Sequence, residues 1–600
     1  MKPTRVRPVL ALALLVSGGT MLAAKERIFV DQWSPTRSEL FIADADGSNA
    51  KKLVAGLAIE YNASFSHDGQ WVVFTSERHG SADIFRISVN GMQLERLTDD
   101  PAFDDQAALS PDGTSLAFVS TRGSGTTDIY ILDLKSRRVR NLTNAPGGDF
   151  RPSWSPDGKR LAFSSDRGTP LQRSAGTWEH VHAASVYVVD ADGRGLRKIS
   201  SDGQLAGSPK WSPDGTRVVF YELAVADTFT ARGLPAQSSV QSRIVSIDLS
   251  TGARVEHAAG PGLKLSPQFL TATRVAYLAK SGPSAALTFS SGEAGTNGDI
   301  GNPAWSDDGK RVVYQSGPIA TIPESRPPGG VLSGRDSRYE LLYASGFPAV
   351  SPDGRQIVLS ERTRRGSADD RTALAIWNTD GTNPRRIFQA DGSAMSPQWS
   401  RDGRWIVFGA GNYFLARVRP AEIMIVKSDG SGARALTTGP GNAGFPSWSP
   451  DGKQVVYRFW TDNAAGLRIV SVADGAVRTL TTGYDNFPGW SPKGDRIVFS
   501  RLANGEFHIY SVAPDGTGLT QLTKVPGDDS HPAWSADGAS ILFSSSRFGF
   551  KDEAPLADIP QPYGELFVMR ADGSEQQPLT DNRWEEGTPA WQPAGTKDRP

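Results

Sequence analysis

The chain has 600 residues, which exceeds what one compact core usually organises and predicts several domains or a repeat architecture. Apolar residues make up 38% of it and charged residues 22%, and the formal net charge is −1. This balance excludes a disordered chain and gives no basic footprint for nucleic acid. The sequence has no cysteine, which excludes disulfides and thiolate metal sites, whereas its 63 glycines and 40 prolines favour an all-β fold with many tight turns.

Residues 1–24 have the pattern of a secretory signal peptide. Lys2, Arg5 and Arg7 precede an apolar run that ends in the small residues Ala23 and Ala24. A membrane anchor is the alternative, but the run is short and interrupted by serine and glycine, and its flank suits cleavage. We therefore expect cleavage near Ala24, a periplasmic or secreted protein, and no membrane span in the mature chain 25–600.

A four-residue turn recurs along the mature chain. The tetrapeptide Ser-Pro-Asp-Gly is typical of a type I β-turn, because Pro presets φ at its second position and Gly tolerates the conformation that follows. It begins at Ser110, Ser155, Ser212, Ser351 and Ser449, and close variants begin at Ser66, Ser306, Ser400, Ser491 and Ser535. Each turn follows an aromatic or apolar anchor and precedes an apolar run, which predicts a strand on either side of it.

Two further strands complete each repeat unit. A third β-rich segment follows, as in 128–133, 422–426 and 565–569, and commonly leads into an Asp-Gly turn, after which a fourth segment ends near a Leu-Thr pair. Four short antiparallel strands predict one blade of a β-propeller. Ten units have a clear anchor, and a degenerate eleventh unit, with Leu265 as its anchor, fills the gap between Trp211 and Trp305.

The chain ends are expected to supply a twelfth blade. Residues 27–54 resemble strands two to four of a blade and residues 588–591 resemble a first strand, so we predict that the termini pair and leave no free sheet edge. Twelve blades exceed the usual number in one ring, which favours two fused propellers over a single wide ring. A break between the two is expected near residues 255–300.

The repeat resembles that of the TolB-like propellers. The shared features are the aromatic-Ser-Pro-Asp-Gly turn, the apolar strand followed by Ser-x-Arg, the Asp-Gly turn and the Leu-Thr pair, and they cover nearly the whole mature chain. The resemblance implies a propeller, a fold that hosts many unrelated functions. We expect no α/β domain before the blades, unlike in TolB, so the resemblance does not extend to membership of the Tol-Pal envelope system.

Polar residues just before several first strands are candidate binding groups. In a propeller the first strand lines the central channel, so these residues are expected to ring its mouth and to bind a cation, a basic peptide or sugar hydroxyls. They are Asp104, Asp105, Asp149, Arg151, Asp485, Asn486, Asp528, Asp529 and His531. The alternative is that each carboxylate only caps its own loop.

Two histidines and a repeated arginine are further candidates. His180 and His182 would share one face of a strand and are candidate ligands for a divalent cation, although no nearby residue completes the set. The arginine of the Ser-x-Arg motif recurs once per blade, which indicates a structural role, and we expect it to pair with turn aspartates such as Asp112 or Asp157. These arginines are Arg78, Arg122, Arg167, Arg362, Arg501 and Arg547.

The motifs favour a binding protein over an enzyme. The sequence has no Gly-x-Ser-x-Gly, Walker, Rossmann or His-Glu-x-x-His motif. We expect a non-enzymatic propeller that binds a protein or peptide partner in the cell envelope, through its channel mouth and through loops inserted at 222–242, 281–300, 315–340 and 548–562. Two alternatives stay open: a metal-assisted polysaccharide lyase or hydrolase with its site in the channel, and an accessory subunit of a separate peptidase.

Overall fold

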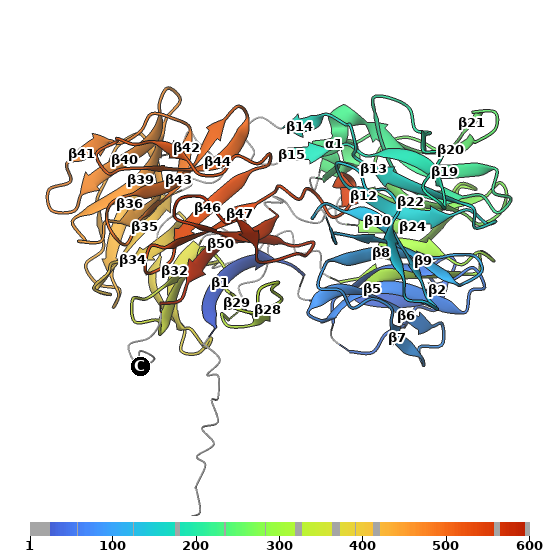
Figure 1. Ribbon diagram of the computed structural model, residues 1–600, viewed down its shortest axis with the longest axis horizontal. Helices are drawn as coiled ribbons and strands as arrows, with labels where there is room; N and C mark the ends of the chain where they lie inside the picture. The colour runs from blue at the N-terminus through green and yellow to red at the C-terminus, as the bar shows by residue number, and fades with distance from the viewer. Residues whose placement is uncertain are drawn as a thin grey trace, which may run out of the picture.

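The strands of the protein form two lobes that lie side by side (Figure 1). The computed structural model describes residues 25–35, 37–56, 58–123, 125–173, 180–232, 236–281, 284–317, 327–362, 372–389, 392–411, 420–556 and 564–593. The signal peptide predicted at 1–24 lies outside these residues. None of the helices in the described part of the chain has the length and apolarity needed to cross a membrane.

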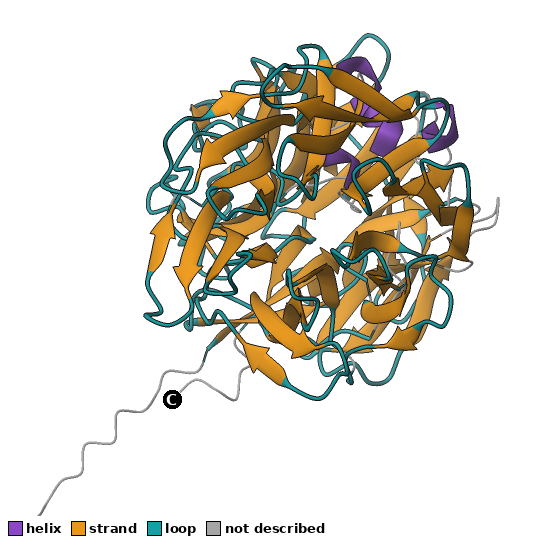
Figure 2. Ribbon diagram, turned by 90° about the vertical axis from the view of Figure 1, so that its right-hand side faces the viewer, coloured by secondary structure: helices purple, strands orange, loops and turns teal. Residues whose placement is uncertain are grey.

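The first lobe consists of sheets that lie around a common centre, as the end-on view shows (Figure 2). One sheet contains β4 (Glu60–Phe65), β5 (Trp71–His79), β6 (Ser81–Ser88) and β7 (Leu94–Arg96). The next contains β8 (Asp104–Leu109), β9 (Ser115–Ser120), β10 (Asp128–Asp133) and β11 (Val139–Asn141). It is followed by β12 (Asp149–Trp154), β13 (Arg160–Ser165), β16 (Ser185–Asp190) and β17 (Arg197–Lys198), with a side hairpin of β14 (Leu171–Arg173) and β15 (His180–His182).

The remaining sheets of the first lobe include one that the N-terminal segment completes. One sheet contains β18 (Gln204–Trp211), β19 (Arg217–Ala224), β20 (Ser242–Asp248) and β21 (Arg254–Ala258). The short helices η1 (Val225–Asp227), α1 (Thr228–Arg232) and η2 (Ala236–Ser239) lie between β19 and β20 in the chain. The next sheet contains β22 (Leu263–Phe269), β23 (Val275–Ser281), β24 (Ser284–Phe289) and β25 (Ala294–Gly298). The last contains β26 (Gly301–Trp305), β27 (Arg311–Ser316), β2 (Glu39–Asp44) and β3 (Lys51–Lys52).

The second lobe repeats this plan with the later part of the chain. Its sheets begin with β30 (Ala349–Val350), β31 (Gln356–Arg362), β32 (Thr372–Asn378) and β33 (Arg385–Gln389). Two units then share one sheet: β34 (Ala394–Trp399), β35 (Trp405–Gly411), β36 (Ala421–Lys427) and β37 (Arg434–Ala435), with β38 (Asn442–Trp448), β39 (Gln454–Trp460), β40 (Ala465–Ser471) and β41 (Val477–Thr479). The next sheet contains β42 (Asp485–Trp490), β43 (Ile497–Ala503), β44 (Glu506–Val512) and β45 (Thr520–Gln521).

The C-terminal sheets complete the second lobe. One contains β46 (Asp529–Trp534), β47 (Ser540–Ser545), β48 (Glu565–Arg570) and β49 (Gln577–Pro578), with the 3-10 helix η3 (Ala554–Leu556) between β47 and β48 in the chain. The other contains β50 (Glu585–Trp591), β1 (Glu26–Trp33), β29 (Tyr339–Tyr343) and β28 (Val331–Leu332).

The order of contacts between first strands places a channel at the centre of each lobe. In the first lobe β4, β8, β12, β18, β22 and β26 contact one another in this order, and β26 contacts β4 again. In the second lobe the same holds for β30, β34, β38, β42, β46 and β50. The second strand of each sheet is apolar on both faces because neighbouring sheets cover it, as in β9, which is buried from Leu116 to Ser120.

The N-terminal strands are divided between the two lobes. β1 pairs with β50, with Ile28 opposite Trp591, so the first and last strands of the chain meet as predicted. β2 instead pairs with β27 of the first lobe, with Phe41 opposite Tyr314, so residues 39–52 do not join the C-terminal strand. The sequence alone could not assign β1 and β2 to different sheets, because two different sheets each need a contribution from the N-terminal segment.

The chain therefore crosses from one lobe to the other twice. The first crossing follows β1 and leads to β2, and the second follows β27 and leads to β28. Residues 255–300, where we expect a break, contain β21 to β25 of the first lobe instead. The anchor of the degenerate unit also differs, because Phe269 pairs with Val275 at the start of the second strand, whereas Leu265 pairs with Leu278 farther along that strand. Fewer residues separate Phe269 from its partner Val275 than separate an anchor such as Trp154 from its partner Leu161, so the turn is shorter than in the other units. The dipeptide Ser266-Pro267 lies within the first strand, β22, and not in the turn.

Candidate functional site

The first strand of each sheet carries one residue in the left-handed region of backbone conformation. It lies at a β-bulge three positions before the anchor, with φ from 30 to 56°, and a proline follows it in most sheets. A bulge re-aims the side chain, here toward the channel. In the first lobe these residues are polar: Asn62, Gln106, Arg151, Ser208, Ser266 and Asn302. In the second lobe they are Phe347, Ser396, Phe445, Phe487, His531 and Thr588.

Hydrogen bonds join the polar set across the channel of the first lobe. The side-chain amide of Asn302 donates to Asn62 Oδ1 at 2.8 Å, and Arg151 Nη2 lies 3.4 Å from Asn302 Oδ1. Asn62 Nδ2 in turn donates to both carboxylate oxygens of Asp105 at 2.9 Å. Arg151 and Asp105 therefore belong to a hydrogen-bonded network in the first channel, and no sequence motif marked their partners Asn62 and Asn302. Asn302 could still have been identified as a channel residue from the sequence, because it directly precedes the proline of its first strand.

The end of this channel that faces the second lobe is filled by the protein itself. The loop between β47 and β48 reaches out of the second lobe, and its residues 551–556, which we call the lock segment, enter the first lobe (Figure 1). Arg151 donates to the two oxygens of Asp552 at 3.0 and 2.5 Å, and Gln106 Nε2 donates to the carbonyl of Lys551 at 3.0 Å. Helix η3 of the lock segment also contacts α1 of the first lobe.

Glu553 is the most deeply bound residue of the lock segment. It is fully buried and accepts hydrogen bonds from Ser208 N at 2.6 Å, from Ser208 Oγ at 3.0 Å and from the Tyr221 hydroxyl at 2.7 Å. A Cβ atom on Gly207 would lie 2.4 Å from the Glu553 carboxyl, so this close approach needs glycine. Burial raises the pKa of Glu553, and the cation of Arg151 opposes that rise.

A second loop of the second lobe also enters this mouth. Trp584 donates its indole N–H to Glu77 Oε1 at 2.9 Å and packs edge-on against Tyr61. Asp581 accepts a hydrogen bond from Thr121 Oγ1 at 2.6 Å and from Lys551 Nζ at 2.9 Å. These buried polar contacts fix the lobes to each other and leave the lobe-facing mouth closed to an external ligand.

Most of the predicted acidic residues are partners of the Ser-x-Arg arginines. The N···O distances are 2.6 Å for Arg122 and Asp104, 2.6 Å for Arg167 and Asp149, 2.6 Å for Arg501 and Asp485, and 3.0 Å for Arg547 and Asp529. All four carboxylates are buried. Burial raises the pKa of Asp104 to about 7 even though Arg122 opposes the rise. These pairs fasten the first strand of a sheet to the end of its second strand.

The expected pairing of these arginines with turn aspartates is wrong. Asp112 accepts hydrogen bonds from Ser110 Oγ at 2.6 Å and from the Thr114 amide at 3.0 Å, within its own turn. Asp157 accepts one from Ser155 Oγ at 2.5 Å in the same way. A short side chain in a tight turn reaches its own backbone first, which leaves the arginines to the carboxylates of the first strands.

The channel of the second lobe is lined by aromatic rings. The ring centroids of Phe445 and Phe487 lie 4.4 Å apart, and those of Phe487 and His531 lie 3.9 Å apart. Burial lowers the pKa of His531 to about 3, so its imidazole is neutral. Asn486 Oδ1 accepts a hydrogen bond from the Phe487 amide at 3.0 Å, and Asp528 Oδ1 accepts one from the Phe507 amide at 2.7 Å. Asn486 and Asp528 therefore support the backbone.

The histidine pair is placed in the side hairpin of the first lobe. His180 and His182 are the ends of β15, and the side chain of His180 lies outside the described residues. His182 Nδ1 lies 3.0 Å from the carbonyl oxygen of Thr169. Within the described part of the chain, no group of three or more His, Asp or Glu side chains is arranged to hold a metal ion.

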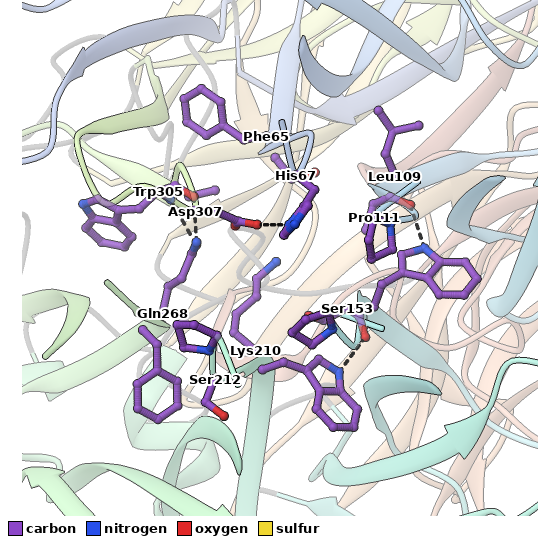
Figure 3. Close-up of a pocket in the computed structure, with 18 residues that line it drawn as sticks. Phe65, His67, Leu109, Pro111, Ser153, Lys210, Ser212, Gln268, Trp305 and Asp307 are labelled. Atoms are coloured by element: carbon purple, nitrogen blue, oxygen red, sulfur yellow. Dashed lines mark hydrogen bonds and ion pairs between the residues drawn. The ribbon is translucent and has the colours of Figure 1, made fainter. Parts of the chain in front are cut away.

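The opposite end of the first-lobe channel contains an open pocket of about 230 Å³, which we call the distal pocket (Figure 3). It is lined by the last residues of the first strands and by the turns that follow them, including Ala108, Trp154, Lys210, Gln268 and Trp305. The indole N–H of Trp154 donates to the carbonyl of Ala108 at 3.1 Å, and Gln268 donates to the carbonyl of Trp305 at 2.6 Å. The walls of the pocket are thus held by contacts between neighbouring sheets.

Lys210 is the main charged group of the distal pocket. Its side chain extends into the middle of the pocket (Figure 3), and among the described residues it has no hydrogen-bond or ion-pair partner. Burial, followed by the nearby cation of Arg151, lowers the pKa of Lys210 to about 8. His67 and Asp307 also line the pocket and contact each other, and the carboxylate of Asp307 opposes the fall in the pKa of Lys210. No sequence motif marked Lys210, because only the folded channel brings it to the centre.

Comparison with known proteins agrees with this arrangement of sheets. The model of the TolB beta propeller domain matches residues 25–123, 100–222 and 412–552, which together are more than half of the chain. The chain belongs to the TolB beta-propeller domain family. The TolB-like resemblance of the repeats is thereby confirmed.

Individual relatives of this TolB-type propeller protein are distant. An uncharacterized protein of Agrobacterium fabrum is 33% identical over 82 residues, which are 14% of this chain and 28% of that protein. The chain thus spans less than a third of that relative. TolB from Acinetobacter baumannii is 15% identical, with 82% of each chain covered and a TM-score of 0.27. An oligogalacturonate lyase in complex with manganese is 16% identical, with 77% of this chain and 98% of that chain covered and a TM-score of 0.24.

Proposed function

We propose that the protein is an exported, non-enzymatic binding protein made of two six-bladed propellers, and that it binds a protein or peptide partner at the distal pocket. The cyclic order of contacts between the first strands supports the two propellers. The signal-peptide pattern of residues 1–24 supports export to the periplasm or the medium.

The open distal pocket is the observation that carries this proposal. The other mouth of the first lobe is occupied by the lock segment, and aromatic rings meet in the channel of the second lobe. Four of the predicted acidic residues are buried in ion pairs, and the other two, Asp105 and Asp528, are buried and hydrogen-bonded within the protein. The distal pocket instead combines aromatic side chains with polar and charged groups such as Lys210 and Gln268, which can orient a ligand.

A bulky substitution in the pocket tests this function. Ala108 directly precedes the anchor of β8, and its carbonyl accepts the indole N–H of Trp154. Ala533 of the second lobe has the same position in β46, and its carbonyl accepts the indole N–H of Trp591 at 3.2 Å. Ala108→Trp should fill the distal pocket, whereas Ala533→Trp is the matched control for any disturbance of the blade.

The readout is the difference between the two variants in affinity capture from cell-envelope extract. Proteins that the parent and Ala533→Trp retain should be lost with Ala108→Trp. If Ala108→Trp folds with the melting temperature of the control and captures the same proteins as the parent, the proposed site is wrong.

A further inference from the structure

The distal pocket contains an amine, that of Lys210, which has no direct hydrogen-bond or ion-pair partner among the described residues. The carboxylates of the lock segment are already bound at the other end of the channel. Asp552 pairs there with Arg151, and Glu553 accepts hydrogen bonds from Ser208 and Tyr221. At the distal end, Asp307 is paired with His67. Lys210 is therefore half-buried at the base of an open pocket without a direct ion-pair partner, and the more distant carboxylate of Asp307 only partly offsets the effect of burial on its pKa.

A cation in this position costs free energy that a bound anion would recover. Taking an ammonium group out of water without a partner is unfavourable, and natural proteins pair such groups or use them in a site. The lowered pKa of Lys210 has the same cause. A carboxylate placed within hydrogen-bonding distance would reverse both effects, since an opposite charge favours the protonated amine.

The surroundings of the pocket indicate a ligand that extends beyond this single group. A surface groove of about 820 Å³ continues from the pocket and shares His67, Pro111, Trp154 and Pro156 with it. The groove contains charges of both signs, with Arg138 and Arg140 beside Asp112, Asp133 and Asp157. Its mixed charge gives no preference for a polyanion.

We infer that Lys210 is the anchor of a subsite for one carboxylate of a bound peptide, whose chain continues along the groove past Pro111 and Pro156. This inference rests on the proposed function and specifies its ligand. The carboxylate would come from an acidic side chain or from a C-terminus, and the ammonium would donate to it in the manner of a charge-assisted hydrogen bond.

The test observes the Lys210 amine directly. Lysines of the full chain are reductively methylated with ¹³C, which keeps their charge, and the Lys210 resonance is assigned by its absence in Lys210→Arg. The probes are the tripeptide acetyl-Ser-Glu-Ser-amide and the same tripeptide with glutamine. Lys453, exposed in the turn between β38 and β39 of the second lobe, supplies the reference resonance.

The glutamate peptide should shift the Lys210 resonance and raise the pKa of that amine, and the glutamine peptide should bind at least tenfold more weakly. In Lys210→Met the affinity for the glutamate peptide should fall at least tenfold, as measured by isothermal titration calorimetry, while Lys210→Arg should retain it. Equal shifts with both peptides, or none at saturation, would overturn the inference. A response to inorganic phosphate or galacturonate without one to the glutamate peptide would also overturn it. The Ala108→Trp capture experiment does not depend on the charge of residue 210. Its failure would contradict the proposed function, whereas failure of the peptide experiment would contradict only the carboxylate subsite.

Discussion

Arg151 and Asp552 lie 401 positions apart in the chain and share two hydrogen bonds of 3.0 and 2.5 Å in the channel of the first lobe. Both side chains are almost completely buried, with exposed fractions of 13% and 4%. This pair connects a first strand of one lobe to a loop of the other. It explains why a residue that the sequence marks as a ligand group is not available for an external ligand.

Arg151→Met should strongly destabilise the protein. Removing one member of a buried ion pair leaves the other charge uncompensated, which typically costs about 3–5 kcal/mol. The measurement is the free energy of unfolding in a denaturant titration. Arg194→Ala is the control, because its ion pair with Asp192 is exposed and its loss should not change the melting temperature measurably. Equal effects of the two substitutions would show that the lock contact contributes nothing.

Gly207→Ala should displace the lock segment. The new methyl group would overlap the Glu553 carboxyl, and overpacking of this kind typically costs about 1–3 kcal/mol. Gly298→Ala is the control, since a Cβ there meets no atom within 4 Å. In the double variant Gly207→Ala/Glu553→Ala the effects should be less than additive, because the truncated side chain makes room. Strict additivity in the double-mutant cycle contradicts the contact.

Stability should fall as the pH rises through the range in which Glu586 titrates. Burial, followed by the nearby carboxylate of Glu565, raises the pKa of Glu586 to about 8. A carboxyl with a raised pKa holds its proton better in the folded chain, so its contribution is complete below pH 4.5 and is lost as the pH rises to about 8. The slope for one such group is about 1.4 kcal/mol per pH unit.

Glu586→Gln should reduce this pH dependence. The neutral amide has no proton to lose, so the free energy of unfolding between about pH 5 and 8 should decline less steeply than in the parent. Part of the pH dependence should remain in the variant, because the pKa values of Glu60, Glu77 and Asp104 are also raised, to about 7. An unchanged slope in the variant means that Glu586 is ionised in the folded chain.

Phe487→Ala should loosen the second lobe. Its ring contacts Phe445 and His531 in the channel, and truncation of a buried phenylalanine typically costs about 3–5 kcal/mol. Phe487→Leu keeps most of the volume and should cost much less. Thermal unfolding followed by near-ultraviolet circular dichroism measures both. A melting temperature that is the same for both variants would mean that the rings do not support the channel.

The repeat made the blade predictable at the level of single residues. The turn serines, the apolar second strands and the aromatic anchors lie where the Ser-Pro-Asp-Gly spacing indicates, because each unit is a local structure of four neighbouring strands. The degenerate unit shows the limit of this reasoning, since its Ser-Pro dipeptide indicates Leu265 as the anchor and the true anchor is Phe269.

The candidate site was predictable only in part. Arg151 and Asp105 line the first channel, but Asp104 and Asp149 bind arginines of their own sheets. The inserted loop 548–562 has the composition of a recognition loop, and its described residues fill the mouth of the neighbouring lobe. Whether a loop binds a partner or the rest of its own chain depends on which surface it meets.

The sequence by itself therefore determined the all-β repeat, its four-strand unit and the meeting of the chain ends, because short-range periodicity encodes these features. The tertiary structure decided which sheet receives β2, that the lock segment closes one mouth, and that Lys210 stands unpaired in the other. These relationships join residues hundreds of positions apart through burial and charge, and no local pattern encodes such distances.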